Sequence, residues 1–422
     1  MRMTRCLTLL AVLCFPAAAA ADDSGARAPL RTLKEAYVSA LQNSERITIS
    51  AEAVREAEAV YRQTLGDALP ELTYRRTVTR KDRTGSTPER MFRLSKTDLS
   101  GYRELAELRA DTAEVRRLVH ERLRAEQLLL FDVAGAFYGY LQSAENITAT
   151  NRLVDLSRER LSELQKRVRV GRTREADAVG QEYQIESLLS QLEESERLLE
   201  SRGNLLSFLA DAPVARPDAI DAGVSRAGRT LPPLASFLAR IGARPDVRAA
   251  SENRESAGAL LDAARADRLP QLDATANYYT DRPTSNAGND WDVALTVDVP
   301  VFDWKKRQGA VDEAAAVLKQ REQELRAARR LAELEIRNAW RDYVSARKQL
   351  DLRKKSVDLA RRDYELQARD DRQGLVTSLE VIESLNRLNA AELAQNSARL
   401  QERLAAVNLE VAAGSRPEDI LK

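Results

Sequence analysis

Side chains that could do acid–base, nucleophilic or redox chemistry are scarce in this chain. His120 is the only histidine among 422 residues, and its arginine neighbours predict that it faces solvent. The two cysteines, Cys6 and Cys14, both lie near the N-terminus. No glycine-rich phosphate loop and no pair of carboxylates stands outside the surface of a predicted helix. We therefore expect no enzymatic activity, no metal centre and no cofactor.

Residues 1–21 have the layout of a secretory signal peptide. Arg2 and Arg5 precede the apolar stretch Leu7–Phe15, and a run of alanines ending at Ala21 precedes two aspartates. We expect cleavage after Ala21 and export of the remaining chain. Because both cysteines belong to this segment, the exported chain has no disulfide framework.

Charge and composition restrict the class of partner. Lys and Arg number 66 against 65 Asp and Glu, so no basic excess predicts binding to nucleic acid. Aromatic residues make up only 5% of the chain, whereas alanine, leucine, glutamate and arginine dominate, which is typical of long helices. We interpret the dense charge runs as the solvated faces of such helices.

The sequence repeats itself at a spacing of about 200 residues. Leu69-Pro70-Glu71-Leu72 returns as Leu269-Pro270-Gln271-Leu272, Val154-Asp155-Leu156 returns as Val357-Asp358-Leu359, and Gly171 returns as Gly374. The shift is 200 residues at the first motif and 203 at the other two. A duplicated unit of this kind indicates a building block that buries its apolar faces against copies of itself.

Apolar periodicity predicts the same order of elements in each half. The first half has helices over 32–67, 102–168 and 174–209, with strands at 71–80 and 91–98 around a turn-rich segment at 82–88. The second half has helices over 234–267, 305–371 and 376–412, with strands at 271–280 and 291–302. We accordingly divide the chain into a first repeat (22–210), a linker rich in proline and glycine (211–233), a second repeat (234–414) and a polar tail (415–422).

The second strand pair alternates between apolar and polar residues. One face carries Trp291, Val293, Leu295, Val297 and Val299, joined on the partner strand by Leu272 and Tyr278. Such alternation, with aromatic residues near the strand ends, is typical of transmembrane strands. A sheet packed on a soluble core has the same period. The signal peptide and the positions of the aromatic residues favour the membrane.

The first strand pair is more basic. Arg76 and Arg80 share a face with Leu72 and Tyr74, and Lys96 lies on the return strand. An arginine that faces lipid at mid-depth costs about 2–4 kcal/mol, whereas one near the rim can extend its charge to water. The sequence leaves open whether this pair crosses a membrane.

The order of these features resembles the TolC family of outer-membrane efflux proteins over about residues 32–412. The resemblance includes both Leu-Pro-x-Leu motifs, the step Val299-Pro300-Val301-Phe302-Asp303 from strand to helix, and the turns Val170-Gly171 and Gln373-Gly374. It implies a mainly α fold with a small β part. Tandem helical hairpins would form a coiled-coil tunnel (an α-barrel), and two strand pairs per chain would join a shared trimeric transmembrane β-barrel.

The resemblance also implies a function and partners. It implies a homotrimer in outer-membrane lipid, with a large periplasmic helical part. This would be the passive channel component of a tripartite efflux or type I secretion system, working with a periplasmic adaptor protein and an inner-membrane pump. The adaptor would contact the hairpin tips at Val170, Gly171, Gln373, Gly374 and Leu375. Drug, metal ion, protein and polysaccharide remain open as the exported substrate.

Three acidic residues follow the predicted hairpin turns. Glu380 and Glu383 lie six and nine residues after Gly374, one helical turn apart and so on one face. The resemblance implies that they narrow the periplasmic mouth, where three copies would form acidic rings, with Asp177 at the matching position in the first repeat. The alternative is that they are ordinary polar residues of a helix surface.

One alternative function belongs to another class of protein. A periplasmic coiled-coil structural protein with a TolC-like fold but no working transmembrane barrel would have the same helices. The first repeat favours this alternative because Lys96-Thr97-Asp98-Leu99 stands where the second repeat has its Val-Pro-Val-Phe step.

Overall fold

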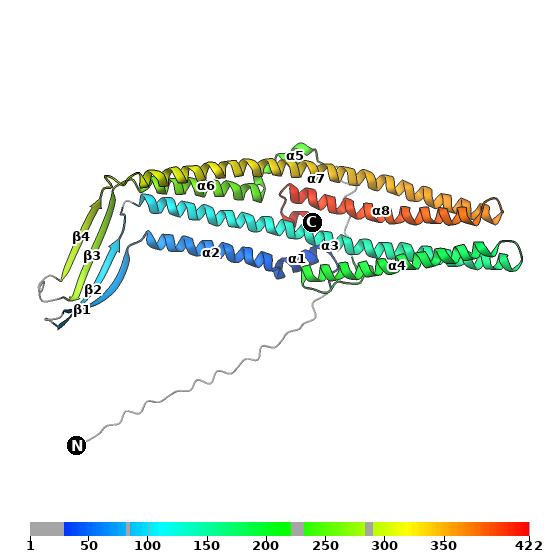
Figure 1. The fold of residues 1–422 in the computed structure, drawn as a ribbon, viewed down its shortest axis with the longest axis horizontal. Helices are drawn as coiled ribbons and strands as arrows, with labels where there is room; N and C mark the ends of the chain where they lie inside the picture. Colours follow the sequence, from blue (N-terminus) through cyan, green and yellow to red (C-terminus); the bar gives the residue numbers. More distant parts are fainter. Residues whose placement is uncertain (1–28, 82–84, 100, 221–231, 283–289, 422) are drawn as a thin grey trace, which may run out of the picture.

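The computed structural model describes residues 29–81, 85–99, 101–220, 232–282 and 290–421. The signal peptide expected at residues 1–21 therefore lies outside the described residues. The described chain is a long rod. A β-sheet forms one end, and two turns that each connect a pair of helices form the other (Figure 1).

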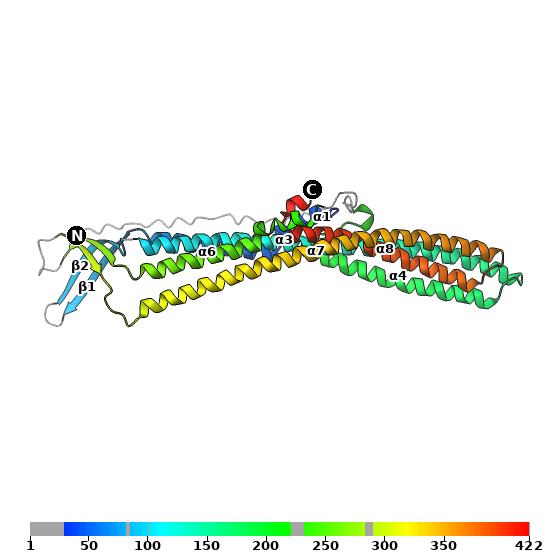
Figure 2. The ribbon, with the colours of Figure 1, turned by 90° about the horizontal axis from the view of Figure 1, so that it is seen from above.

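Two helices run along the whole helical part of the rod. They are α3 (Tyr102–Arg169) and α7 (Lys306–Arg372), with 68 and 67 residues. At 1.5 Å per residue each is roughly 100 Å long. Shorter helices lie beside them: α2 (Glu45–Asp67) and α6 (Pro245–Ala266) in the half near the sheet, and α4 (Glu175–Ala210) and α8 (Ser378–Ala412) in the other half (Figures 1 and 2). None of the described helices is long and apolar enough to cross a membrane.

The two halves of the chain place equivalent residues in equivalent surroundings. A shift of 203 residues relates Ala136 to Ala339 and Tyr140 to Tyr343, and all four are buried. Each half has a long helix that ends in a turn, followed by a helix of 36 or 35 residues that runs back along it. The sequence repeat therefore corresponds to a repeat of three-dimensional structure.

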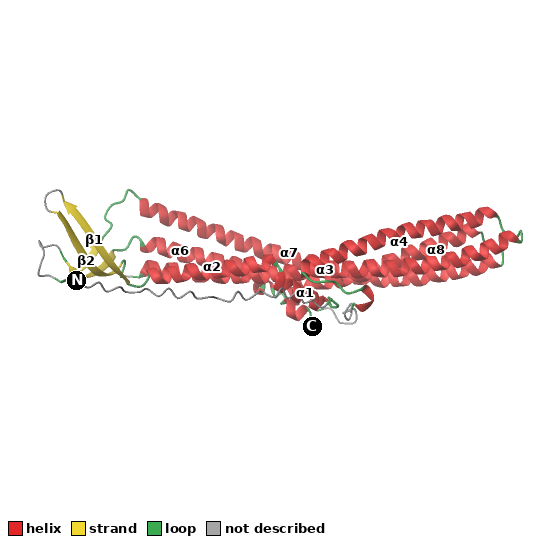
Figure 3. Cartoon of the chain, turned by 90° about the horizontal axis from the view of Figure 1, so that it is seen from below, coloured by secondary structure: helices red, strands yellow, loops and turns green. Residues whose placement is uncertain are grey.

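The main apolar core lies at the middle of the rod. There the short helix α1 (Leu33–Asn43) packs near the C-terminal ends of α4 and α8, against the middle of α3. Tyr37, Leu130, Phe137, Leu206 and Val411 belong to this core and are buried. A smaller cluster forms where α5 (Leu234–Leu238) meets α7 and α8, and the chain ends in α9 (Pro417–Ile420) beside the core (Figure 3).

All four strands form one antiparallel sheet in the order β1-β2-β3-β4. The strands are β1 (Glu71–Lys81), β2 (Gly85–Lys96), β3 (Gln271–Asp281) and β4 (Trp291–Asp298). The strand pair of the first repeat is thus joined to that of the second through β2 and β3. β1 and β3 begin directly after Pro70 and Pro270, as the Leu-Pro-x-Leu motifs predict.

The predictions of continuous helices over 32–67 and 234–267 are wrong, and the two helices break at equivalent places. In the first repeat Ser44 is extended (φ −72°, ψ 120°) and separates α1 from α2. In the second repeat the 3₁₀ turn Ile241–Ala243 lies between α5 and α6, and α6 begins at Pro245. Proline has no N–H group and its ring clashes with the carbonyl four residues back, so it starts a helix rather than continuing one.

Two strand boundaries also differ from the prediction. β2 begins at Gly85, inside the segment expected to be a turn; its Pro88 pairs only with β1, because pairing with β3 starts at Arg90. β4 ends at Asp298 rather than at residue 302. Pro300 cannot donate to a neighbouring strand. Val299, predicted as a membrane-strand residue, therefore lies just beyond β4.

Candidate functional site

Most of the large apolar side chains of the four strands fall on one face of the sheet. The register places Leu72, Leu94, Ala276 and Val293 in one row, and Tyr74, Phe92, Tyr278 and Trp291 in the next. The large side chains of these two rows are 45% to 68% exposed in the single chain. The result is a continuous apolar surface, which we call the apolar face.

Two basic residues of the first strand pair, Lys96 and Arg76, lie on the same side of the sheet as the apolar face. Lys96 folds back toward the helices, where its Nζ lies 3.0 Å from a Glu104 carboxylate oxygen and donates to the Asp67 carbonyl at 3.1 Å. Arg76 pairs in register with Arg90, beyond the aromatic row. Arg76 is the middle residue of β1, and Val78 lies beyond it on the same face. Whether the first strand pair crosses a membrane stays open.

The opposite face of the sheet is mainly polar, with Met91 and Tyr279 as its large apolar side chains. Arg93 Nε donates to Asn277 Oδ1 at 2.9 Å, and Asn277 Nδ2 donates to Asp292 Oδ1 at 2.7 Å. These bonds link β2, β3 and β4 through their side chains. A sheet with one apolar and one hydrogen-bonded polar face fits a position between lipid and water.

The step from β4 into α7 exposes further aromatic surface. Phe302 is 73% exposed and Trp304 is 86% exposed, and their ring centroids lie 4.8 Å apart. Trp304 and Lys305 take positive φ angles of 53° and 67°, which turn the chain between Pro300 and the helix. The sequence motif identified Pro300 and Phe302, whereas Trp304 was missed because its exposure depends on this turn.

Two turns of one design form the other end of the rod. Gly171 and Gly374 have φ angles of 71° and 74°, and in each turn the next residue donates its N–H to the carbonyl five residues back, at 2.9 and 3.0 Å. This arrangement needs a residue in the left-handed backbone conformation, which glycine adopts without steric cost. Val170, Gln373 and Leu375 are exposed beside the glycines. The five residues predicted to meet an adaptor thus lie at the end farthest from the sheet (Figure 1).

Glu380 is the third residue of α8 and closes its first turn. One carboxylate oxygen accepts hydrogen bonds from the Thr377 N–H at 2.6 Å and the Thr377 hydroxyl at 2.9 Å. These bonds lower the pKa of the Glu380 carboxyl below its usual range. Glu383 is exposed one turn further along the same helix, 4.0 Å from Arg387. Both carboxylates lie on the surface of the single chain, as the prediction of a pore constriction requires.

Asp177 occupies the equivalent place in α4. Partial burial raises the pKa of its carboxyl, but hydrogen bonds from Arg174 and Thr173 outweigh this effect and the pKa is lowered. The Arg174 side chain has no acceptor group with which to cap the helix. Its N–H donates to Asp177 Oδ2 at 3.3 Å, and its guanidinium donates to Asp177 Oδ1 at 3.2 Å. Among the described residues of one chain, no contact joins Asp177 to Glu380 or Glu383.

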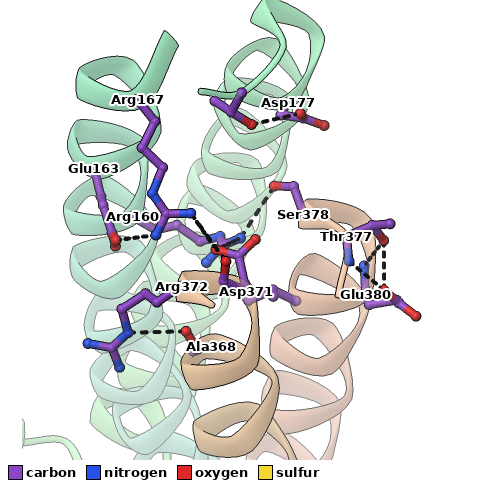
Figure 4. A network of polar contacts seen from close by, with 12 residues as sticks. Arg160, Glu163, Arg167, Asp177, Ala368, Asp371, Arg372, Thr377, Ser378 and Glu380 are labelled. Carbon is purple, nitrogen blue, oxygen red and sulfur yellow. Dashed lines mark hydrogen bonds and ion pairs between the residues drawn. The ribbon is translucent and has the colours of Figure 1, made fainter. Parts of the chain in front are cut away.

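A buried ionic cluster ties the two hairpins together near their tips (Figure 4). Asp371 Oδ2 of α7 lies 3.0 Å from Arg167 Nη1 and 3.4 Å from Arg160 Nη2, and both arginines belong to α3. Arg160 Nη2 also donates to the Ser378 hydroxyl of α8 at 3.3 Å. The side chains of Arg160 and Asp371 are only 7% and 8% exposed. We call these four residues the tip cluster.

A second buried cation lies at the middle of the rod. The Arg244 side chain is fully buried and donates to the Ala412 carbonyl at 2.7 Å, at the C-terminal end of α8. It also contacts carboxylate oxygens of Asp246 and Glu335, both at 2.6 Å. Gly414 packs directly against it: a Cβ atom there would lie 2.9 Å from Arg244 Cγ. Arg244 therefore joins the start of α6 to α7 and to the end of α8.

His120 is half-buried rather than solvent-facing, because α6 packs along this part of α3. Burial and the nearby charge of Arg248 lower the pKa of its imidazole. Over the described ranges, no group of three or more histidine, cysteine, aspartate or glutamate residues is placed to hold a metal ion.

Comparison with known proteins gives one family match. Residues 240–415 match the model of the family described as outer membrane efflux protein. This segment includes the second strand pair, α7, the turn at Gly374 and α8. A search of curated protein sequences finds no match.

Solved structures share the fold over nearly the whole chain. The CusC structure superposes with a TM-score of 0.77 at 19% identity, over 91% of this chain and 92% of that one. The outer membrane protein VceC of Vibrio cholerae gives 0.76 at 18% identity, over 91% and 96%. The open state of the MtrE outer membrane channel of Neisseria gonorrhoeae gives 0.77 at 20% identity, over 91% and 89%.

Proposed function

We propose that the protein is an outer-membrane export channel. Our premise is that residues 240–415 match the outer membrane efflux protein family. In addition, the described chain has the fold of solved outer-membrane channels. It would work as the passive conduit of a tripartite efflux or type I secretion system.

One observation carries this proposal: the apolar face and the exposed hairpin turns lie at opposite ends of one rod (Figure 1). The apolar face would lie in the lipid of the outer membrane. The helices, roughly 100 Å long, would extend from it into the periplasm. A purely structural coiled coil has no need for four strands with one continuous apolar surface.

The free edges of the sheet support a homotrimer. β1 and β4 are the outer strands, and their outward backbone groups have no partner strand in the chain as described. Such edges are stable in a membrane only when another strand pairs with them. Three copies would supply twelve strands, more than the roughly eight of the smallest known barrels. The polar face of each sheet would then line the water-filled interior.

The tips support a role as a gated mouth. Three copies would bring three Glu380 and three Glu383 side chains around one axis, and Asp177 would add a third acidic position. Rings of carboxylates select for cations. The exposed turns at Val170 and Leu375 would meet the periplasmic adaptor, which connects the channel to an inner-membrane pump.

Planar-bilayer recording of the purified protein tests the proposal. Protein extracted from outer membranes should insert and give discrete, cation-selective conductance steps. Recovery of the protein in the soluble periplasmic fraction, with no conductance after reconstitution, would instead indicate a periplasmic structural protein.

A further inference from the structure

The most extensive contact between the two hairpins of one chain is made by α3 and α8, beside smaller contacts of α4 with α8. Glu145 on α3 lies 3.2 Å from Arg399 on α8, and Asn396 donates to Asn146 at 3.3 Å. In Figure 1 these two helices are the inner pair, while α7 and α4 lie on the outer sides of the two hairpins. We call the inner contact the α3–α8 seam.

The internal repeat relates this seam to a pair of helices that have no such contact within one chain. A shift of 203 residues carries α3 onto α7 and α4 onto α8, as the matched pair Tyr140 and Tyr343 and the matched turn glycines show. The equivalent of the α3–α8 seam is therefore a contact between α7 and α4. Because these helices lie on opposite sides of the chain, the contact requires a second copy.

Apolar side chains on α7 and α4 are exposed where their equivalents are covered. Leu359 on α7 is 68% exposed, whereas its equivalent, Leu156, packs against a buried cluster of α3, α4 and α8. Phe208 on α4 is 79% exposed, whereas its equivalent, Val411, is 3% exposed. The single chain thus leaves apolar surface uncovered on α7 and α4, the two helices for which the internal repeat predicts a contact.

The residues equivalent to the ion pair Glu145–Arg399 are also oppositely charged, but the positive and negative charges are exchanged. The equivalent of Glu145 is Lys348, and the equivalent of Arg399 is Glu196. Both residues are exposed, and neither takes part in an ion pair within the chain as described. We propose that α7 of one copy packs against α4 of the next, and that Lys348 pairs there with Glu196 of the second copy.

Because the charges are exchanged, each helix attracts only the helix that belongs to its own seam. Lys348 on α7 attracts Glu196 but repels Arg399, whereas Glu145 on α3 attracts Arg399 but repels Glu196. These like charges disfavour contact of α7 with α8 of another copy, and of α3 with α4 of another copy. The apolar residues supply the buried area, and the charges select which helices meet.

The proposed seam ends before the tips. Gln349 and Glu193 are the equivalents of Asn146 and Asn396, and they can form an amide–carboxylate hydrogen bond. Nearer the turns, the equivalents of Arg160 and Ser378 are Asp363 and Glu175, two carboxylates that repel each other. The attraction between copies is thus confined to the part of α7 and α4 away from the turns.

Cysteine cross-linking tests the seam, which deepens the proposed function by naming the contact between subunits. The chain has no cysteine after Cys14, so introduced pairs react without background. Lys348→Cys combined with Glu196→Cys, treated with a short bismaleimide in isolated membranes, should give covalent dimers and trimers. The matched control Glu145→Cys with Arg399→Cys should react within single chains and give no ladder of covalent dimers and trimers.

The outcomes separate the seam from the channel. Conducting oligomers without a 348–196 ladder would overturn the seam and leave the channel proposal standing. A ladder from protein that gives no conductance would support the seam and contradict the channel.

Charge variants provide a second readout that does not depend on cross-linking. Lys348→Glu and Glu196→Lys should each lower the fraction of oligomer measured by size-exclusion chromatography with light scattering. The double variant should restore it. Failure of the double variant to recover oligomer, with unchanged helical content by circular dichroism, would contradict the pairing.

Discussion

Glu380 has one of the two roles that the sequence offered as alternatives, and its position is compatible with the other, which stays a proposal. Its carboxylate caps the first turn of α8, which is the ordinary role of an acid at the third position of a helix. It is also exposed at the tip of the rod, with Glu383 on the same side of the helix. Because capping favours the charged form, the bond that stabilises the helix also keeps the proposed ring negative.

We expect Glu380→Gln combined with Glu383→Gln to reduce the cation selectivity of the channel. The pKa of Glu380 is lowered in the folded chain, so its charge persists as the pH falls to the usual glutamate range of about 4.3 and is lost only below it. Reversal potentials in a salt gradient at pH 7 and pH 5 should therefore agree for the wild type. Loss of selectivity between those values, or equal loss in the control Glu365→Gln on α7, would contradict the assignment.

Removing the acid of the tip cluster should destabilise the protein strongly. Asp371→Asn leaves Arg160 buried without its counter-charge, a change that typically costs about 3–5 kcal/mol. Asp363→Asn is the matched control, because Asp363 pairs with Arg387 at the surface, where such pairs contribute about 1 kcal/mol or less. Thermal unfolding in detergent compares the two. Equal shifts would show that the cluster adds no more than a surface pair.

The sequence predicted some of these residues and not others, for a physical reason. The capping pair Thr377 and Glu380 and the glycine of the turn are local signals, fixed by positions a few residues apart. Asp371 lies in a run of charged residues that resembles any solvated helix face. Its burial depends on Arg160 and Arg167, more than 200 residues away in the chain, and no spacing rule reveals that contact.

At the scale of elements, periodicity located the helices and strands but missed breaks that depend on packing. Ser44 alone is a weak break signal, and α1 separates from α2 because Ala36, Tyr37 and Ala40 are drawn into the core. Pro245 was a local signal for the second break that the prediction overlooked. The register of the sheet was also beyond local rules, yet it decides where Arg76 and Lys96 lie.

The junction at the middle of the rod should be sensitive to one added methyl group. Gly414 and Gly374 have similar φ angles of 78° and 74°, so alanine at either position costs about 1–2 kcal/mol of backbone strain. Only Gly414→Ala also clashes with Arg244, including its Cα at 3.1 Å, whereas Gly374 has open space around it. The overlap should add about 1–3 kcal/mol. Equal losses of stability in the two variants would show that Arg244 can move aside.

The two faces of the sheet should respond differently to the same substitution. Leu295→Arg places a cation on the apolar face, where it should cost about 2–4 kcal/mol if that face meets lipid. Thr296→Arg, one residue along on the polar face, should cost little. The yield of folded protein in the outer-membrane fraction reports the difference. A normal yield for Leu295→Arg would contradict contact with lipid.

At the scale of the whole molecule, duplication accounts for the rod. Each repeat provides one full-length helix, a strand pair and a returning helix, and the two repeats join through β2 with β3, α3 with α6 and α3 with α8. The sequence predicted this architecture because its motifs recur in order at a nearly constant spacing. It could not predict how the repeats meet, since that depends on contacts between distant segments.

The central claim is that one end of the rod reaches the cell surface and the other lies in the periplasm. Labelling with a membrane-impermeant maleimide tests it directly, using Asp290→Cys beside β4 and Gln373→Cys at the α7–α8 turn. In intact cells position 290 should react at once, while position 373 should react only after the outer membrane is permeabilised. Equal reactivity at both positions in intact cells, or none at position 290 until permeabilisation, would contradict the account.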